Sequence, residues 1–366
     1  MQNENLKIAY LGLGSNLGDR EQNIKAALAS LAAQDGIKLL RSSSIIETKP
    51  LCQKVQPDYF NCVAEIQTSL SPDNLLDVLR KIESLSGRER TSQVWASRII
   101  DIDILLFGSD VVKTLKLTIP HANMHLRSFV LTGLCELAPE AVHPLLGEKI
   151  YVLRDRLNGE NFHPDSRLPQ LVSVAGIIGA GKSTLAHGLA DAFDFRLIKE
   201  AYDANPFMRD VYAGKKEYAL DSQLYFFLSR MEQLKLRNFK DNKIAISDYI
   251  MNQEIVYAKM WLDEIQFELY KKINVEMGAS AVEPMVVIYL KASAKECLKR
   301  IHLRNRPYEQ GIDIKFLNRL CGEYEKLFTE FKACPVITLD ADKCDFRLGD
   351  EVEKIGKQIS YYTAGK

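Results

Sequence analysis

The sequence has no excess charge of either sign, since its 366 residues carry 48 Lys and Arg against 48 Asp and Glu. A chain without net charge has no overall attraction for nucleic acid or an acidic membrane. Its longest apolar runs, such as PMVVIYL (284–290), are far shorter than the ~20 residues that span a bilayer. We therefore expect partners that are neither nucleic acids nor membranes.

Two further features are missing. The first residues, MQNENLKIAYLGLG, lack the basic start and long apolar core of a secretory signal. The seven cysteines are dispersed without any CxxC spacing, which argues against a disulfide framework or a cysteine metal site. We expect reduced thiols and a cytoplasmic protein.

The length predicts two domains, because ~150 residues typically form one, and the 46% hydrophobic content is that of a globular chain. The polar stretch LNGENFHPDSRLPQ (157–170) is rich in turn-forming residues and has no periodic apolar pattern. We interpret it as a linker between a domain at 1–156 and a domain at 171–366.

The first half alternates short strands with amphipathic helices. The expected strands are 8–14, 38–48, 59–70 and 99–108, and the expected helices are 20–34 and 71–86. This β-α-β-β-α-β order is the split βαβ arrangement, so we expect an α+β domain that is ferredoxin-like.

The second half contains short apolar segments separated by long helical stretches. These segments are LVSVAGII, FRLIKE, KIAISD, MVVIYLK and CPVITLD. Their alternation with helices predicts an α/β domain with a parallel, doubly wound sheet.

The stretch GIIGAGKST (176–184) follows the first of these segments and has the spacing of a phosphate-binding P-loop. Its glycines let backbone N–H groups surround phosphate oxygens, Lys182 supplies a positive charge, and Ser183 supplies a hydroxyl for Mg²⁺. The predicted ATP-binding residues of this loop are Gly176, Gly179, Ala180, Gly181, Lys182, Ser183 and Thr184.

Three later segments, KEAYDANPFM (199–208), SQLYFFLSRMEQLK (222–235) and CLKRIHLRNRPYEQGI (297–312), resemble the deoxynucleoside kinase family. The resemblance covers about 170–362 and implies that Glu200 is the base that takes the proton of the sugar 5′-hydroxyl. It also implies a homodimer. The substrate-binding residues it implies are Gln223, Arg230, Asp248 and Glu254, and the lid arginines that cover the triphosphate are Arg300, Arg304 and Arg306.

The chain departs from this family after the third strand, where Asp248-Tyr249-Ile250 stands in place of the usual acid-Arg-Ser. The missing cation leaves a second interpretation open, in which this half is a nucleotide-binding module without turnover. A nucleoside monophosphate acceptor is a third. Among deoxynucleosides, deoxyadenosine, deoxyguanosine and deoxycytidine all remain candidates.

In the first half, the informative stretch is GRERTSQVWASRIIDIDILLFG (87–108). Asp101 and Asp103 lie at positions i and i+2 of a strand, so they point the same way with Cα atoms about 7 Å apart. Two carboxylates on one face suit Mg²⁺, which fills the rest of its shell with water and phosphates. The nearby Arg88, Arg90 and Arg98 favour a phosphate ligand.

This stretch, with LGLGSNLGDR (11–20), QPDYFNCVAEIQTSLSP (56–72) and LTIPHANMHLRSFVL (117–131), resembles the 6-hydroxymethyl-7,8-dihydropterin pyrophosphokinases over about 6–152. The resemblance implies pyrophosphoryl transfer from Mg·ATP to the pterin hydroxymethyl group. The residues it implies are Asp101 and Asp103 for Mg²⁺, Arg88, Arg98 and His121 for phosphates, and Tyr59, Asn61, Trp95, Arg127 and Phe129 for the substrate. VWASR replaces the family's usual Arg-Trp-Gly-Pro-Arg, so we expect altered loop kinetics.

Overall fold

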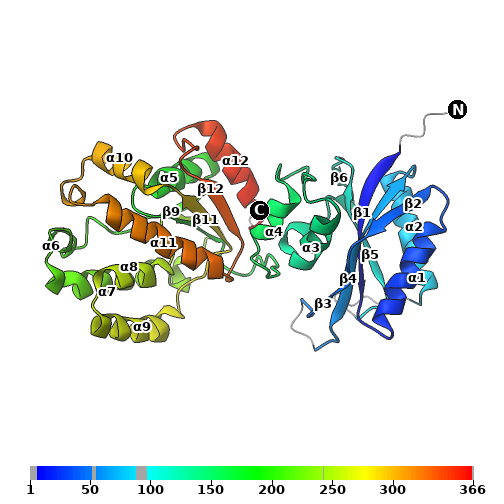
Figure 1. Cartoon of the computed structure of the whole chain (residues 1–366), viewed down its shortest axis with the longest axis horizontal. Coiled ribbons are helices and arrows are strands. Elements are labelled where there is room, and N and C mark those ends of the chain that lie inside the picture. The colour runs from blue at the N-terminus through cyan, green and yellow to red at the C-terminus, as the bar shows by residue number, and fades with distance from the viewer. Residues whose placement is uncertain (1–5, 52–54, 88–96, 242, 365–366) are drawn as a thin grey trace. The chain divides into compact units, whose positions relative to one another are not determined.

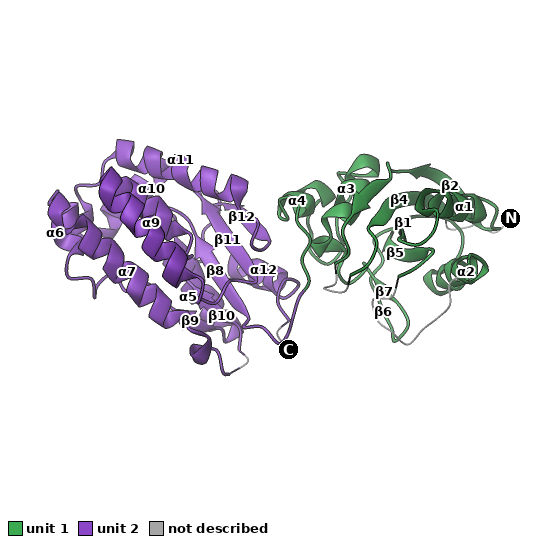
Figure 2. Ribbon diagram, turned by 90° about the horizontal axis from the view of Figure 1, so that it is seen from below, with its two compact units in different colours: residues 1–163 green, residues 164–366 purple. Residues whose placement is uncertain are grey.

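The computed structural model describes residues 6–51, 55–87, 97–241 and 243–364. The chain divides into two compact units, Met1–His163 and Pro164–Lys366, drawn in green and purple in Figure 2. The prediction of two domains is confirmed. Within the described residues, no helix is both long enough and apolar enough to cross a bilayer.

The described residues of unit 1 form one main sheet, four helices and a small two-stranded ribbon (Figure 1). Its strands are β1 (Lys7–Ser15), β2 (Ile37–Ser42), β3 (Ile46–Thr48), β4 (Tyr59–Thr68), β5 (Asp101–Phe107), β6 (Val112–Lys113) and β7 (Thr118–Ile119). Its helices are α1 (Arg20–Ala32), α2 (Pro72–Leu85), α3 (Ser128–Leu137) and α4 (Ile150–Asp155), with a 3₁₀ turn η1 (Met124–Leu126).

The main sheet has the order β2-β4-β1-β5, with β3 also paired to β4, and these pairs are antiparallel. Successive side chains along each strand point to opposite faces of the sheet. Leu11 and Leu13 of β1 and Ile102 of β5 point into a core that also contains residues of α1 and α2. Gly12 and Asp101 point to the opposite face, which carries the pocket described below.

The single strand predicted at 38–48 is wrong, because the structure has two strands, β2 and β3, that both pair with β4. The interruption lies at the serine run. The Ser43 hydroxyl accepts from the N–H of Val63 at 2.9 Å, so a side chain takes the place of a ladder carbonyl. The chain therefore bends there before it rejoins β4.

The segment predicted as a linker, 157–170, spans the division between the units. Before the division, Phe162 N–H donates to the carbonyl of Leu126 at 2.9 Å, and Asn161 Oδ1 accepts from Ser128 N–H at 2.7 Å. After it, the buried Gln170 accepts from Ala364 N–H at 2.7 Å. Each part of the segment is therefore attached to its own unit.

Unit 2 is a five-stranded sheet with helices around it (Figure 1). Its strands are β8 (Leu171–Ala175), β9 (Arg196–Ile198), β10 (Ala245–Ser247), β11 (Val286–Lys291) and β12 (Val336–Asp340). Its helices are α5 (Lys182–Phe193), α6 (Met208–Tyr212), α7 (Ala219–Gln233), α8 (Gln253–Trp261), α9 (Glu264–Gly278), α10 (Ala294–Arg304), α11 (Ile314–Glu330) and α12 (Gly349–Ile359). Its 3₁₀ turns are η2 (Lys216–Tyr218), η3 (Leu236–Asn238) and η4 (Pro307–Glu309).

The order of this sheet is β12-β11-β8-β10-β9, and all four pairings are parallel. The predicted parallel sheet is thus confirmed, with a strand in each of the five predicted segments. The central strand β8 has β10 on one side and β11 on the other, and ligands of open α/β sheets bind beyond the carboxyl end of such a strand. The P-loop begins there.

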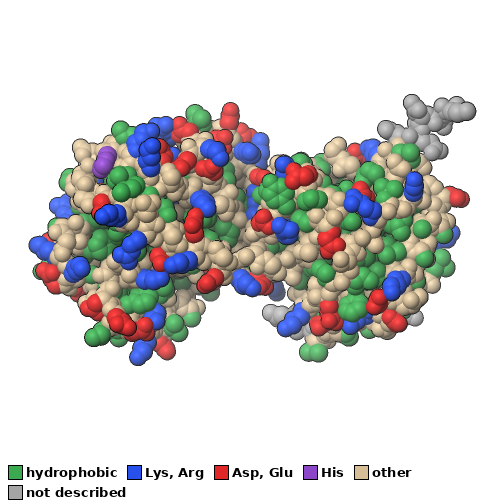
Figure 3. Space-filling view, in the orientation of Figure 1, with side chains coloured by type: hydrophobic (Ala, Val, Ile, Leu, Met, Phe, Trp, Pro, Cys, Tyr) green, Lys and Arg blue, Asp and Glu red, His purple; other side chains and the backbone are tan. Residues whose placement is uncertain are grey.

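Charge on the visible surface is mixed. On the face drawn in Figure 3, Lys and Arg in blue are interspersed with Asp and Glu in red on both units. This distribution agrees with the equal totals of the two signs in the sequence.

Candidate active sites

Unit 1 carries a pocket of about 300 Å³ on the face of the sheet opposite α1 and α2. The pocket is lined by parts of β1, β4 and β5, the segment after Thr48, and residues between His121 and Val130. The predicted site residues that line it are Tyr59, Asn61, Arg98, Asp101, Asp103, His121, Arg127 and Phe129. Two further predicted residues, Arg88 and Trp95, lie outside the described residues.

The floor of this pocket depends on two glycines of β1. In the sequence LGLG the leucines face the core, so Gly12 and Gly14 face the pocket. A Cβ on Gly14 would lie 2.9 Å from Oδ1 of Asn61, which is closer than real side chains approach. The glycines therefore leave the space in which the carboxylates of β5 and the amide of Asn61 are exposed.

Asp101 and Asp103 both reach the pocket from the edge of β5, opposite Gly14 and Gly12 of β1. Arg98 donates a hydrogen bond to Asp101. Arg127 Nη1 lies 3.8 Å from Asp103 Oδ2. The pocket thus combines two partly exposed carboxylates with two guanidinium groups, a donor set that fits a divalent cation together with the phosphates that it accompanies.

His121 is a neutral donor. Burial, with Arg127 close by, lowers its pKa to about 4. Its Nδ1 accepts from Asn123 N–H at 3.3 Å, so in the neutral ring the proton is on Nε2. That Nε2 lies 3.8 Å from Asp103 Oδ2, where it can donate to an anionic ligand in the pocket.

Sequence reasoning missed the role of Asn16 in GSNLGDR. Asn16 is buried, and its Oδ1 accepts from Arg98 N–H at 2.6 Å while its own N–H donates to the Arg98 carbonyl at 3.0 Å. Its Nδ2 is also 3.3 Å from both Gln56 Oε1 and Ser97 Oγ. Asn16 therefore fixes the backbone from which the Arg98 side chain enters the pocket.

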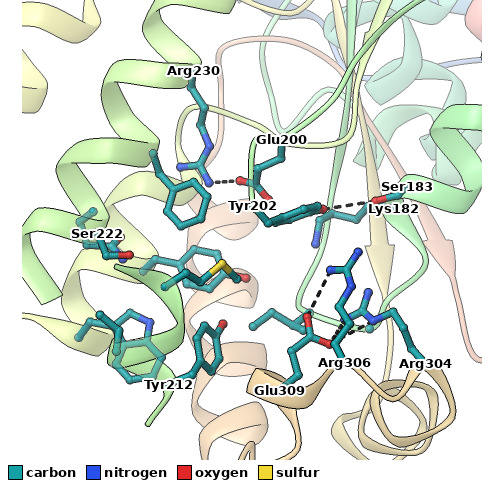
Figure 4. A pocket seen from close by; sticks show the side chains of 18 of the residues that line it. Lys182, Ser183, Glu200, Tyr202, Tyr212, Ser222, Arg230, Arg304, Arg306 and Glu309 are labelled. Atoms are coloured by element: carbon teal, nitrogen blue, oxygen red, sulfur yellow. Dashed lines mark hydrogen bonds and ion pairs between the residues drawn. The ribbon is translucent and has the colours of Figure 1, made fainter. Parts of the chain in front are cut away.

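Unit 2 carries a second pocket, of about 110 Å³, at the carboxyl end of β8 (Figure 4). The predicted site residues in its lining are Gly179, Gly181, Lys182, Ser183, Thr184, Glu200, Gln223, Arg230, Arg304 and Arg306. The predicted residues behind this lining are Gly176, Ala180, Asp248, Glu254 and Arg300, several of which hold the lining residues in place.

The P-loop requires its glycines for space. Gly179 has φ +84°, and a Cβ there would lie 2.7 Å from the carbonyl oxygen of Cys297. Lys182 turns back on the loop and donates to the carbonyls of Gly176 at 2.9 Å and Ile177 at 3.1 Å. Burial lowers the pKa of Lys182 to about 8, although Asp248 opposes this effect.

Asp248, at the end of β10, connects the P-loop to the predicted base. Its Oδ2 accepts from the Ser183 hydroxyl at 2.6 Å, and its Oδ1 accepts from the backbone N–H of Glu200 at 2.8 Å. Tyr202 also reaches Oδ2, at 3.4 Å. One buried carboxylate thus positions a hydroxyl suited to Mg²⁺ and the residue predicted to remove a proton.

Arg230 lies between two acids. It donates to Glu200 and to Glu254, and Tyr270 donates to the second oxygen of Glu254. Figure 4 shows the guanidinium of Arg230 directed at the Glu200 carboxylate across the pocket from the P-loop. Gln223, also buried, lines the pocket from the same helix, α7.

Tyr249, which stands where the family usually has arginine, is fully buried. It packs with Leu171, Leu234 and Ala245, and its hydroxyl donates to Gln233 Oε1 at 2.6 Å. Its ring lies 5.5 Å from the Arg230 guanidinium. Tyr249 therefore packs beside Arg230, the cation that contacts Glu200, and adds no positive charge of its own.

The lid arginines are held by protein groups. Arg304 donates to Glu309 Oε2 at 2.6 Å, and Arg306 to Glu309 Oε1 at 3.5 Å (Figure 4). Arg300 donates to the carbonyls of Ala180 at 3.3 Å and Ala341 at 2.8 Å. A triphosphate would compete with Glu309 for Arg304 and Arg306.

Sequence reasoning also missed several residues that line this pocket, among them Tyr202, Tyr212, Trp261 and Glu309. Glu309 had a signal, because it is the one acid in RNRPYEQG, three positions after Arg306 in a basic stretch. Tyr202 lies inside the quoted KEAYDANPFM segment. Tyr212 and Trp261 come from separate helices, and no local pattern identifies them.

Comparisons with known proteins match each half of the chain to a different family. The sequence model of 7,8-dihydro-6-hydroxymethylpterin-pyrophosphokinase matches residues 10–139, and that of deoxynucleoside kinase matches residues 172–360. The first half is 44% identical over 136 residues to the 2-amino-4-hydroxy-6-hydroxymethyldihydropteridine pyrophosphokinase of Haemophilus influenzae, covering 37% of this chain and 84% of that protein.

The second half is 32% identical over 196 residues to the deoxyguanosine kinase of Bacillus subtilis, covering 51% of this chain and 95% of that protein. A solved structure of deoxyadenosine kinase from M. mycoides with bound dCTP aligns with TM-score 0.47 and 23% identity, over 52% of this chain and 99% of that one. By the two sequence models and these two relatives, the chain belongs to two families, the hydroxymethyldihydropterin pyrophosphokinases through its first half and the deoxynucleoside kinases through its second.

Proposed function

We propose that the chain is a bifunctional, Mg·ATP-dependent transferase. Unit 1 transfers pyrophosphate to 6-hydroxymethyl-7,8-dihydropterin, and unit 2 phosphorylates the 5′-hydroxyl of a deoxynucleoside. The observation that carries the first activity is the single pocket in which Asp101 and Asp103 meet Arg98, Arg127 and His121. The relatives of each half support the same assignment.

In unit 1, the pterin hydroxymethyl oxygen would bond to the β-phosphorus of ATP and lose its proton to solvent, and the bond from that phosphorus to the α–β bridging oxygen would break to release AMP. Asp101 and Asp103 would hold Mg²⁺, which would polarise the phosphate oxygens. Arg98 and Arg127 balance the charge that develops on the transferred group, and neutral His121 donates from Nε2. Asn61, whose Nδ2 is engaged by Thr48 at 2.8 Å, presents Oδ1 to the pterin ring edge.

In unit 2, the observation that carries the activity is the placement of Glu200 in one pocket with the P-loop, Gln223 and the lid arginines. Glu200 would take the proton of the 5′-hydroxyl, the oxygen would bond to the γ-phosphorus, and ADP would leave. Ser183, oriented by Asp248, would hold Mg²⁺, and Lys182 would leave the loop carbonyls to bind the phosphates.

Among the acceptors, we propose deoxyguanosine. Both oxygens of Glu254, which lies behind the lining, are engaged by Arg230 and Tyr270, so Glu254 has no oxygen left to accept from a base. On the edge that carries N7, guanine presents the two acceptors O6 and N7, whereas adenine presents N7 with an amino group, and cytosine presents an amino group at the corresponding edge. Gln223 would complete the recognition with its amide. The relative named deoxyguanosine kinase supports this choice.

Product analysis tests both activities in one chromatogram. Full-length protein with Mg·ATP should form AMP when hydroxymethyl-dihydropterin is added and ADP when deoxyguanosine is added. AMP without ADP from any of the four deoxynucleosides would favour a nucleotide-binding module in unit 2. ADP formed only with a deoxynucleoside monophosphate would show that the acceptor is a nucleoside monophosphate instead of a deoxynucleoside. No AMP with the pterin would overturn the first assignment.

We also propose that unit 1 is ferredoxin-like. Counting β2, β4 and β5 as second, third and fourth strands, the sheet order is 4-1-3-2, and its pairs are antiparallel. Helices α1 and α2 connect the first strand to the second and the third to the fourth. That connectivity supports the split βαβ arrangement.

A further inference from the structure

The carboxylate of Glu200 receives two hydrogen bonds on one oxygen. Its Oε1 accepts from Arg230 and from Gln253 Nε2, the second at 2.8 Å. The Glu200 side chain is 7% exposed and lies in the lining of the unit 2 pocket. With both donors on Oε1, the carboxylate is fixed in one orientation, and Oε2 is the oxygen left for a ligand.

Gln253, the first residue of α8, is itself held in place. It is 1% exposed, and its Oε1 accepts from the Tyr324 hydroxyl at 3.3 Å. Tyr324 is fully buried and packs against Tyr257, Tyr289 and Phe328. Because Tyr324 occupies the amide oxygen, the amide nitrogen is the atom that faces Glu200.

A neutral donor is suited to this position. The charged groups bonded to Glu200 or to its partners are Arg230 of α7, Glu254 of α8 and Asp248 after β10, and Arg230 is shared between Glu200 and Glu254. Lys182, Arg304, Arg306 and Glu309 line the same pocket. Tyr249 is directed into the core and adds no cation. Gln253 therefore supplies an orienting hydrogen bond without a second positive charge that would hold the proton-accepting carboxylate more tightly.

We propose that Gln253 is a positioning residue for phosphoryl transfer in unit 2, fixing Glu200 so that Oε2 receives the substrate proton. The O5′–H bond breaks as Oε2–H forms, the O5′ electron pair bonds to the γ-phosphorus, and the bond to the bridging oxygen breaks to release ADP. This inference rests on the kinase activity proposed above. The Gln253 amide touches neither substrate nor ATP in this scheme.

The test compares Gln253→Met, which keeps the size of the side chain and removes its donor, with the wild type. We expect kcat for ADP formation to fall about tenfold while KM for the nucleoside stays within about threefold, since a base held in the wrong orientation affects the chemical step. Tyr324→Phe, which leaves the amide but frees its oxygen, should lower kcat by a smaller factor. Gln253→Glu should move the acid limb of the kcat–pH profile to higher pH, because it places a second carboxylate beside Glu200.

Gln170→Met is the matched control. Gln170 is buried in unit 2 and donates to the carbonyls of Asp165 and Leu168, at 2.9 and 2.7 Å. We expect it to lower the melting temperature as Gln253→Met does while leaving kcat unchanged. A Gln253→Met enzyme with wild-type kcat, or one whose loss Gln170→Met reproduces, would overturn the positioning role alone. If Gln253→Met does not fold, an unchanged kcat in Tyr324→Phe decides against it. No ADP from the wild type would overturn the positioning role and the kinase activity together.

Discussion

Gly14 shows at the scale of one residue how a missing side chain makes a site. A Cβ at this position would lie 2.9 Å from Asn61 Oδ1, so Gly14→Ala must displace that amide. We predict that kcat/KM for AMP formation falls roughly five- to tenfold, because one hydrogen bond contributes ~1 kcal/mol. Chromatography of AMP measures the effect, and ADP formation by the same sample is the internal control. Unchanged AMP formation would remove Asn61 from the substrate site.

Lys182 makes a second prediction at this scale. Burial lowers the pKa of its ammonium to about 8, so the free enzyme loses this charge as pH rises through 8. ATP requires the charged form, and we predict that kcat/KM for ATP in ADP formation is level below pH 8 and falls about tenfold per pH unit above it. A profile that is flat from pH 7 to 9 would contradict the prediction. AMP formation, which does not use Lys182, should lack this decrease above pH 8.

At the scale of the element, the sequence was informative wherever a pattern is local. The alternation in IIDIDILL predicted that Asp101 and Asp103 share one face of a strand, and in the structure both line the pocket while Ile102 and Ile104 lie in the core on the other face. Ser71 and Pro72 marked the start of α2, where the Ser71 hydroxyl accepts from Asn74 N–H. The P-loop and the helix that follows it could be predicted from the spacing of the glycines, Lys182 and Ser183 and from the apolar strand before them.

Residues that act across long separations could not be predicted in this way. Gln253 reaches Glu200 across 53 positions, and Asn16 reaches Arg98 across 82. The sequence around either residue does not identify its partner, because the Asn16–Arg98 contact forms only once β1 and β5 are in place, and the Gln253–Glu200 contact only once β9 and α8 are in place. The effect of Tyr249 on the charge beside Glu200 could not be predicted either, since the sequence shows that an arginine is missing but not that Arg230 lies beside Glu200.

The segment that joins α3 to α4 gives a prediction at the element scale. It contains His143, which is buried and accepts from Leu146 N–H at 3.2 Å through Nδ1. Burial, with His125 beside it, lowers the pKa of His143 to about 3 from 6.5. Between these values the unfolded chain binds a proton that the folded chain does not, so the stability of unit 1 falls as pH decreases below 6.5.

At pH 5 this single histidine should cost about 2 kcal/mol of the free energy of unfolding. His143→Asn keeps an acceptor near Nδ1 and cannot titrate, so we predict that the loss of stability between pH 7 and pH 5 becomes smaller by about that amount. Urea unfolding of unit 1, followed by pulse proteolysis at the two pH values, measures the difference. Equal pH dependence in variant and wild type would show that His143 is not the group responsible.

At the scale of the whole molecule, each unit has its own sheet, and the described residues of each unit line a pocket of its own. The linker segment adds hydrogen bonds inside each unit, through Asn161 in the first and Gln170 in the second. The two proposed reactions release different products from ATP, AMP from unit 1 and ADP from unit 2. A substitution in one pocket should therefore be visible in one product only.

Lys182→Ala and Asp103→Asn form the reciprocal pair that tests this independence. The first removes the P-loop charge, and we predict that ADP formation falls on the order of 100-fold, as expected for the loss of a charged hydrogen-bond donor, while AMP formation stays within twofold. The second removes one of two carboxylates proposed to hold Mg²⁺ and should abolish AMP formation while ADP persists. One chromatogram of each variant reports both activities. If Lys182→Ala also lowered AMP formation, the second pocket would be energetically coupled to the first, because Lys182 belongs to unit 2 and its ammonium donates to the P-loop carbonyls of Gly176 and Ile177.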